Sequence, residues 1–178
     1  MISKMREEKD INIRKAEEKD FKEIGKIKYD NWQDIYRGII DNRYLNNMTP
    51  EKCMEEIRNY AENPGAEIFI AENEKTVIGF VAGMPSMEIL GAYQIEFLHV
   101  KKGYQRQGNG KKLIYHIGNK IYTDGYSNIV TDIYTGNAAA GKICEHLGAE
   151  FNRDFYQKLE DFDVPSVEFI WENMDIFK

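Results

Sequence analysis

Residues 105–111, Gln-Arg-Gln-Gly-Asn-Gly-Lys, have the composition of a loop that could bind phosphate. They follow an apolar run that ends at Val100, and residues with helical spacing come after them. A glycine-rich loop at the start of a helix directs unpaired backbone N–H groups and the positive end of the helix dipole toward an anion. Glycine is favoured there because a side chain would keep the anion away from the N–H groups. The sequence therefore predicts an anion-binding loop.

Two common phosphate loops do not fit these residues. Gly103 and Gly108 have the spacing of a P-loop, but Asn109 and Gly110 stand where that motif has Lys and Ser or Thr. The dinucleotide fingerprint has a third glycine three residues after its second, where this chain has Leu113, and it follows the first strand of its fold. Both motifs are therefore rejected.

The segments around the loop have the hydrophobic periodicities of strands and helices. Strands are predicted at 11–16, at 66–83 as a hairpin with its turn at 72–75, and at 92–100, 127–134 and 164–171. Helices are predicted at 17–32, from the N-cap Thr49 to Asn63, from the loop to Asp124, and from the N-cap Asn137 to Gly148. This order predicts an α/β (α+β) fold with a mixed sheet and helices on both faces.

The composition argues against several classes of protein. At 178 residues the chain is expected to form one domain, and no run of about 18 apolar residues could span a bilayer. The net charge of −6 disfavours a nucleic-acid partner and suits a cationic substrate. The charged start, MISKMREEKD, lacks an export signal, so a cytoplasmic location is expected. The three histidines and two cysteines lack ligand spacing, so no metal is expected.

Three segments, taken in order, resemble motifs of the GNAT-type N-acetyltransferase superfamily. The loop matches the family's acetyl-CoA loop, and the other two segments match an N-terminal helix pair and a later helix. The matching residues are Gln105-x-x-Gly108-x-Gly110 after Leu98-His99-Val100; Trp32-x-x-x-Tyr36-x-Gly38-Ile39 with Tyr44-Leu45; and Asn137-x-x-Ala140 followed by Leu147-Gly148. With the closing strand, the resemblance covers nearly the whole chain.

The resemblance implies a fold and an activity. The fold would be a largely antiparallel, twisted mixed sheet within a single domain, 1–178, with an acetyl-CoA core at about 66–148 and acceptor-side helices at about 19–62. The activity would be transfer of an acetyl group from acetyl-CoA to a primary amine of a small molecule or peptide, by direct attack in a ternary complex. A non-catalytic module that binds or senses acetyl-CoA is the alternative.

The resemblance also implies which residues contact the cofactor. The main chains of Leu98 and Val100 would pair with the pantetheine arm as an added strand does, and His99 between them would face the other side of the sheet. Asn137 would hold the pantetheine from the neighbouring helix. The pyrophosphate would be bound by the amides of the loop, namely Gln105, Arg106, Gln107, Gly108, Asn109, Gly110 and Lys111.

Glu96 is the candidate general base. An alkylamine has a pKa of about 10.4, so at neutral pH a base near the nitrogen lowers the barrier. Family members often place an acidic base on the strand that contains Glu96. Strict alternation predicts that Glu96 projects from the same face as Gln94 and Leu98. A solvated or salt-bridged carboxylate is the alternative interpretation.

Cys144 is the candidate acid for the leaving thiolate. In the family a tyrosine usually stands seven residues after the helix asparagine, and counting from Asn137 this position is Cys144. A free thiol has a pKa of about 8.5 and could donate a proton. The alternative, which we favour, is that Cys144 packs with Ile143 and Leu147 in an apolar stripe.

Trp32 and Tyr36 are the candidate acceptor-binding residues. Together with Tyr44 they lie in the region that covers the acceptor site in the family, where aromatic rings could stack on an ammonium group. Trp32 and Tyr36 also have i, i+4 spacing, which is equally typical of the buried stripe of a helix. A homodimer that pairs through the β-rich final segment is possible.

Overall fold

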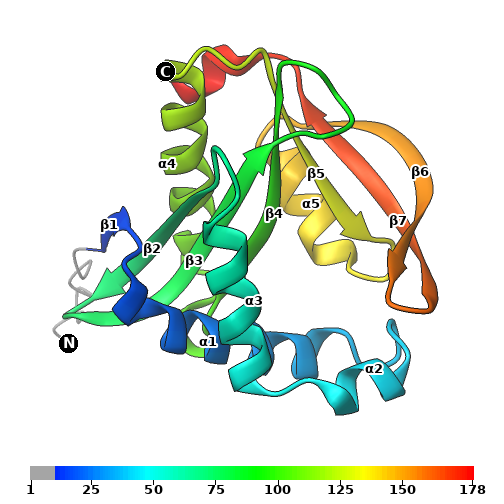
Figure 1. Ribbon diagram of the computed structural model, residues 1–178. Helices are drawn as coiled ribbons and strands as arrows, with labels where there is room; N and C mark the ends of the chain where they lie inside the picture. The colour runs from blue at the N-terminus through cyan, green and yellow to red at the C-terminus, as the bar shows by residue number, and fades with distance from the viewer. Residues whose placement is uncertain (1–10) are drawn as a thin grey trace, which may run out of the picture.

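The computed structural model describes residues 11–178, so the charged start used for the expected location lies outside the described residues. Its centre is a twisted seven-stranded sheet with the order β1-β2-β3-β4-β5-β7-β6 (Figure 1). Neighbouring strands are antiparallel except for the parallel pair β4 and β5. The strands are β1 (Asn12–Lys15), β2 (Glu67–Asn73), β3 (Thr76–Pro85), β4 (Ala92–Val100), β5 (Asn128–Tyr134), β6 (Glu150–Leu159) and β7 (Phe162–Trp171).

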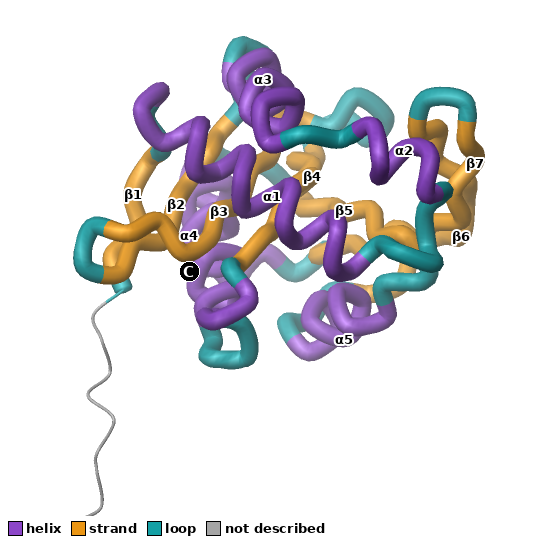
Figure 2. Tube along the Cα trace, turned by 90° about the horizontal axis from the view of Figure 1, so that it is seen from below, coloured by secondary structure: helices purple, strands orange, loops and turns teal. Residues whose placement is uncertain are grey.

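Helices cover both faces of the sheet (Figure 2). On one face lie α1 (Phe21–Ile35), α2 (Asn42–Asn47) and α3 (Pro50–Ala61), and on the other lie α4 (Asn109–Thr123) and α5 (Ala138–His146). Short 3₁₀ turns are η1 (Glu18–Asp20), η2 (Lys102–Tyr104) and η3 (Met174–Phe177). No helix within residues 11–178 is long and apolar enough to cross a membrane. The predicted fold class, a mixed and largely antiparallel sheet between helices, is confirmed.

Each face of the sheet buries its own apolar cluster. Leu113 and Ile117 of α4 pack against the first face together with side chains of β4, β5 and β7. Ile24 of α1 and Ile57 of α3 pack against the second face. Each of these fully buried side chains stabilises the fold by about 1.5–3 kcal/mol. The face covered by α1, α2 and α3 is called the acceptor face below.

The two predicted N-caps are confirmed in atomic detail, whereas the first helix, predicted from residue 17, begins as a 3₁₀ turn and becomes α-helical at Phe21. Thr49 Oγ1 accepts a hydrogen bond of 3.1 Å from the N–H of Lys52, and Pro50 is the first residue of α3. Asn137 Oδ1 accepts a bond of 3.3 Å from the N–H of Ala140 at the start of α5. These caps satisfy N–H groups that have no partner inside the helix.

Two elements were not predicted from the sequence. Most side chains of β6 are exposed, so the strand has no apolar alternation and depends on main-chain pairing with β7. The six-residue helix α2 is too short for a periodic pattern. A side-chain cap on the N–H of Arg43, accepted by Asp41 at 2.7 Å, marks its start.

Candidate active site

The sheet opens between β4 and β5. The two strands are paired only from Ala92↔Asn128 to Ile95↔Thr131. Beyond that rung β4 remains paired with β3, and β5 remains paired with β7, so the two strands diverge (Figure 1). The hydroxyl of Thr131 donates a hydrogen bond of 2.9 Å to the carbonyl of Ile95 at the last rung. The opening, called the split below, leaves one edge of each strand without a strand partner.

A β-bulge at Glu96 changes which residues share a face. Ala82 pairs with Phe97 and Gly83 pairs with Ile95, so Glu96 is the extra residue of β4. Leu98 packs on the α4 side of the sheet, whereas the charge of Glu96 acts on Tyr60, which packs on the acceptor face. The prediction that Glu96 and Leu98 share a face is therefore wrong, because a bulge interrupts the two-residue alternation.

The free edge of β4 has the expected main-chain orientation. The N–H of Lys101 donates to the carbonyl of Ile78 on β3 at 2.8 Å. The carbonyl of Val100 shares a peptide group with this N–H and points the opposite way, into the split. The main chain of Leu98, two residues earlier, points the same way as that of Val100. Gln105 Nε2 donates to this Val100 carbonyl at 2.8 Å and Asn31 Nδ2 at 3.0 Å. The Gln105 side chain therefore anchors the loop to the strand.

Side-chain amides also hold the loop itself in shape. Gln107 Nε2 donates to the carbonyl of Gly103 at 2.9 Å, and the buried Asn109 donates through Nδ2 to the carbonyl of Tyr104 at 2.8 Å. Arg106, with a φ of 56°, adopts the left-handed conformation that L residues rarely take. These bonds pre-order the loop.

The start of α4 exposes backbone donors. Gly108 is the N-cap of α4, and its φ of 80° favours glycine. The first helical hydrogen bond runs from the N–H of Lys112 to the carbonyl of Gly108 at 3.0 Å. The N–H groups of the residues between Gly108 and Lys112 have no acceptor within the helix. A Cβ on Gly110 would meet only the side chains of Leu98 and Val100, at 3.9 and 4.0 Å. Packing within the protein therefore does not require glycine at 110.

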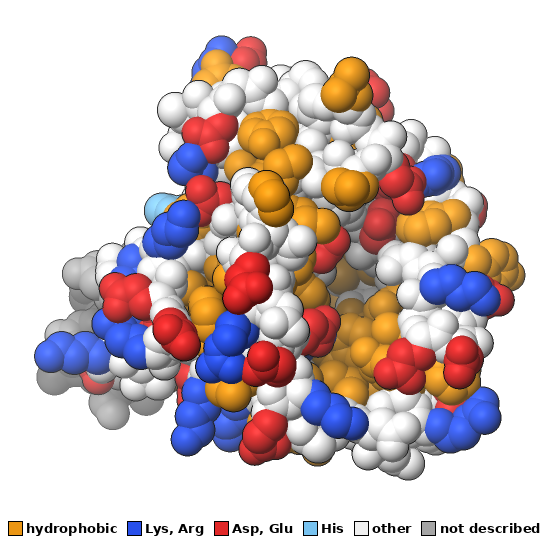
Figure 3. Space-filling view, in the orientation of Figure 1, with side chains coloured by type: hydrophobic (Ala, Val, Ile, Leu, Met, Phe, Trp, Pro, Cys, Tyr) orange, Lys and Arg blue, Asp and Glu red, His pale blue; other side chains and the backbone are white. Residues whose placement is uncertain are grey.

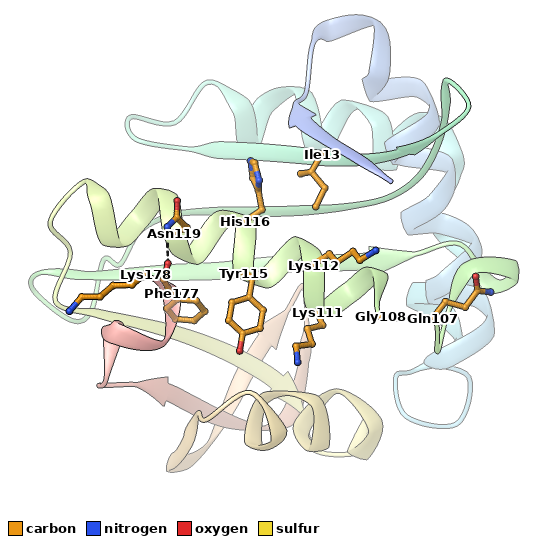
Figure 4. Close-up of a pocket in the computed structure, with 10 residues that line it drawn as sticks. All are labelled: Ile13, Gln107, Gly108, Lys111, Lys112, Tyr115, His116, Asn119, Phe177 and Lys178. Carbon is orange, nitrogen blue, oxygen red and sulfur yellow. Dashed lines mark hydrogen bonds between the residues drawn. The ribbon is translucent and has the colours of Figure 1, made fainter. Parts of the chain in front are cut away.

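The loop borders an open cavity of about 700 Å³ beside α4 (Figure 4). Gln107, Gly108 and Lys111 line its loop end. In Figure 4, Lys111 and Tyr115 project from α4 toward the side on which α5 lies. The ammonium of Lys111 lies 5.5 Å from the centre of the Tyr115 ring. A cation beside exposed N–H groups makes this end of the cavity suited to an anion.

Asn137 is engaged at both ends of its amide. Its Oδ1 caps α5, and its Nδ2 donates to the hydroxyl of Tyr36 at 3.1 Å. The second bond connects α5 to the end of α1 across the split. Hydrogen bonding within the protein therefore accounts for the Asn137 side chain, and its predicted contact with pantetheine stays a prediction.

Cys144 lies in the apolar cluster beneath α5. Only 6% of the residue is exposed, and burial, followed by the charge of Glu145, raises the pKa of its thiol to about 12. A thiol this weakly acidic is a poor proton donor at neutral pH. The geometry favours the packing interpretation, so we leave Cys144 out of the mechanism proposed below.

His99 points away from Leu98 and Val100, as expected. It is buried on the acceptor face, where its Nδ1 lies 3.5 Å from Asn31 Nδ2. Burial, followed by the nearby charge of Lys28, lowers the pKa of His99 to about 3. The imidazole is therefore neutral at physiological pH.

The predicted acceptor-binding aromatics form one cluster. The Trp32 ring lies 4.8 Å from Tyr36, 5.8 Å from Tyr44 and 6.0 Å from Tyr134. Trp32 is buried, and the ammonium of Lys28, itself 1% exposed, lies 5.1 Å from its ring centre. Trp32 thus belongs to the core and already contacts a cation. The three tyrosines are only partly buried and can contact a ligand.

The acceptor face is acidic around the split. Figure 3 shows it hollowed between α3 and the β6–β7 hairpin, with hydrophobic side chains inside and acidic side chains at the rim. Lys28 pairs with Glu56 of α3, and Arg153 pairs with both Glu88 and the buried Glu168. A cavity of about 140 Å³ adjoins Glu56, and Tyr44 and Glu160 also line it.

Glu96 and Asp132, which lie beside the split, form no ion pair with another of residues 11–178. Glu96 is exposed, and desolvation by its surroundings, followed by repulsion from Glu56, raises its pKa while Lys28 opposes the change. Asp132 was not predicted from the sequence. The signal was a lone acidic residue in the apolar strand at 127–134, and the strand alternation places it opposite Ile133.

The fold and the loop define a class of enzyme. A mixed sheet that splits between two parallel strands, with a glycine loop and helix start beside the split, is the arrangement of the acyl-CoA N-acyltransferases. Residues 31–149 match the model of the Acetyltransferase (GNAT) family, and the chain belongs to this family.

Several relatives support this assignment. The uncharacterized N-acetyltransferase YuaI of Bacillus subtilis is 26% identical over 122 residues, which are 67% of this chain and 69% of that protein. The PaiA N-acetyltransferase of Thermoplasma acidophilum, solved in complex with coenzyme A, has a TM-score of 0.69 at 20% identity over 89% of this chain and 98% of its own. The ribosomal-protein-alanine N-acetyltransferase of Brucella melitensis has a TM-score of 0.71 at 19% identity over 90% and 98%.

Proposed function

We propose that this protein transfers an acetyl group from acetyl-CoA to a cationic primary amine of a small molecule or peptide, in a ternary complex. The observation that carries the proposal is the pre-ordered loop at the start of α4, placed directly beside the split. The complex of the PaiA relative with coenzyme A supports the choice of cofactor. When bound, acetyl-CoA supplies the acetyl group as a thioester.

The residues present fit this cofactor. Packing within the protein does not require glycine at position 110. The absence of a side chain there leaves space beside the free N–H groups, as expected where a phosphate oxygen approaches the backbone. Each charge-assisted bond to such an oxygen contributes about 1.5–3 kcal/mol. Lys111 adds a positive charge, and the free edge of Leu98 can pair with an amide-containing arm as a strand does.

The charges of the acceptor face support a cationic acceptor. Glu56, Glu88, Glu96, Asp132, Glu160 and Glu168 outnumber the cations Lys28, Lys52 and Arg153 around the hollow and the small cavity beside it. Such a surplus of negative charge concentrates ammonium groups and disfavours anionic acceptors. The name of the Brucella relative denotes an alanine of a ribosomal protein as acceptor, so both peptide and small-molecule amines are candidates.

Proton removal is the chemical task of the acceptor face. An ammonium must lose a proton before its nitrogen can attack, and a carboxylate without a cationic partner can accept it. Glu96, the predicted base, and Asp132 meet this condition. The expected cytoplasmic location and the possible homodimer stay predictions.

The proposal is tested by offering the purified protein acetyl-CoA and a panel of amines, including diamines, aminoglycosides, lysine and peptides with a free N-terminus. Free CoA is measured with a thiol reagent, and the acetylated product by mass spectrometry. We expect turnover with at least one cationic amine and none with its N-acetylated form. Binding of acetyl-CoA without turnover on any amine would support the non-catalytic module instead.

A further inference from the structure

We propose that Asp132 binds the acceptor ammonium and removes its proton, with Glu96 contributing charge at the entrance. This role rests on the acetyltransferase function proposed above. Asp132 is the first residue of β5 beyond the last rung, Ile95↔Thr131, so it lies at the apex of the split. Ile133 packs on the α4 side, which places Asp132 on the acceptor face.

One carboxylate oxygen of Asp132 lacks a partner. Its Oδ1 is shielded from solvent and accepts no hydrogen bond from residues 11–178. Shielding a carboxylate oxygen without a donor is unfavourable, so its occurrence at the apex of a cleft indicates a ligand that brings donors. A primary ammonium carries three N–H donors and a positive charge, and therefore complements this oxygen.

The neighbouring charges favour a proton on Asp132. Glu168 lies directly opposite on β7, but Arg153 Nε holds its carboxylate at 3.1 Å and Asn152 Nδ2 at 2.7 Å. Glu88, from the connection between β3 and β4, also uses Arg153. Asp132 therefore lies near two carboxylates, Glu168 and Glu88, that share the single cation Arg153. Carboxylates that crowd one another are the usual way to obtain a base that works near neutral pH.

The pKa of Asp132 agrees with this geometry. Desolvation, followed by Glu168 and Glu88, raises the pKa to about 7, while Arg153 and a hydrogen bond from Gln94 oppose the change. Tyr134, which follows on the same strand and face, is itself raised in pKa by burial and is neutral. A base is most effective when its pKa lies near the working pH.

Glu96 is less suited to proton removal. Desolvation and then Glu56 raise its pKa as well, but the residue is exposed and Lys28, which pairs with Glu56, opposes the rise. Asp132 is the more shielded of the two, so water competes less for its oxygen. The side chain of Glu96 can instead attract a cation at the entrance to the hollow.

The proton balance follows from the reaction. The ammonium gives its first proton to Asp132, the neutral nitrogen forms the C–N bond as the C–S bond breaks, and the second N–H proton restores the CoA thiol. Asp132 then releases its proton to solvent. One proton leaves per amide formed, and no further reactant is needed.

The test compares D132N, E96Q and wild type with the best amine of the panel between pH 6 and 10. For D132N we expect kcat/KM to fall about 100-fold at pH 7, a typical value for loss of a general base, and the loss to shrink as pH rises and free amine forms. For E96Q we expect mainly a higher KM. The matched control is D154N. Asp154 is exposed and lies on the face of β6 opposite to that of Arg153, so the variant should behave as wild type.

A second readout needs no activity. Carboxyl resonances followed by carbon-13 NMR should show one group titrating near pH 7 in wild type and E96Q but not in D132N. The role is refuted if that resonance is unchanged in D132N, or if E96Q rather than D132N shows the pH-dependent loss. Wild-type protein that turns over no amine would refute the proposed function itself and this role with it.

Discussion

Replacement of Asp132 by Asn is expected to stabilise the protein above neutral pH. The native pKa is raised from 3.8 to about 7, so between these values the native state binds a proton that the unfolded state has lost. The contribution of the Asp132 carboxyl to the free energy of unfolding therefore falls as pH rises from about 4 to about 7. A shift of about three pH units corresponds to about 4 kcal/mol at most. Because the side chain is partly exposed, we expect about 2 kcal/mol.

Urea unfolding of D132N and wild type at pH 4, 5, 6, 7 and 8 measures this difference. Near pH 4 and below, the carboxyl is largely neutral in both the native and the unfolded wild type, so the two proteins should have similar stability; the difference should grow from there up to about pH 7. At pH 8 the variant should be more stable by about 2 kcal/mol, because the wild type then carries the shielded charge. Carboxylates elsewhere titrate equally in both proteins and cancel in the comparison. An equal difference at every pH, or a variant less stable at pH 8, would refute the reasoning.

Three further predictions follow from other parts of the site. Gly108→Ala should lower the free energy of unfolding by about 1–2 kcal/mol, because the residue has a φ of 80°, and should weaken acetyl-CoA binding measured by calorimetry. Gly103→Ala is the control: Gly103 has no neighbour within 4 Å and no positive φ, so neither quantity should change. Cys144→Ala should lower the free energy of unfolding by about 1 kcal/mol and leave turnover unaltered; a slower rate at equal acetyl-CoA affinity would restore a catalytic role. His99, with a pKa of about 3, should show no imidazole titration by NMR between pH 5 and 9, and a titration in that range would contradict its burial.

Local signals in the sequence determined the loop and the helix starts. Gly108 with a positive φ, the N-caps Thr49 and Asn137, and the amphipathic stripe of α4 are all decided by neighbours within a few residues along the chain. Such features obey fixed spacings, so the order of helices and most strands, and hence the family motifs, could be predicted. β6 could not, because most of its side chains are exposed, which weakens the apolar alternation that a strand leaves in the sequence.

The arrangement at the split was decided by tertiary structure. A bulge opposite β3 turned Glu96 away from the face of Leu98, and nothing in the residues of β4 marks its position. The raised pKa of Asp132 depends on Glu168 and Glu88, which are far from it in sequence and are brought beside it by the pairing of β5 with β7 and by the β3–β4 connection. The sequence alone was enough to predict an anion-binding loop, because such a loop is built from consecutive backbone N–H groups. Only the folded sheet decided that Asp132 has a shielded oxygen without a donor and a raised pKa, because a pKa depends on burial and on charges that distant strands supply.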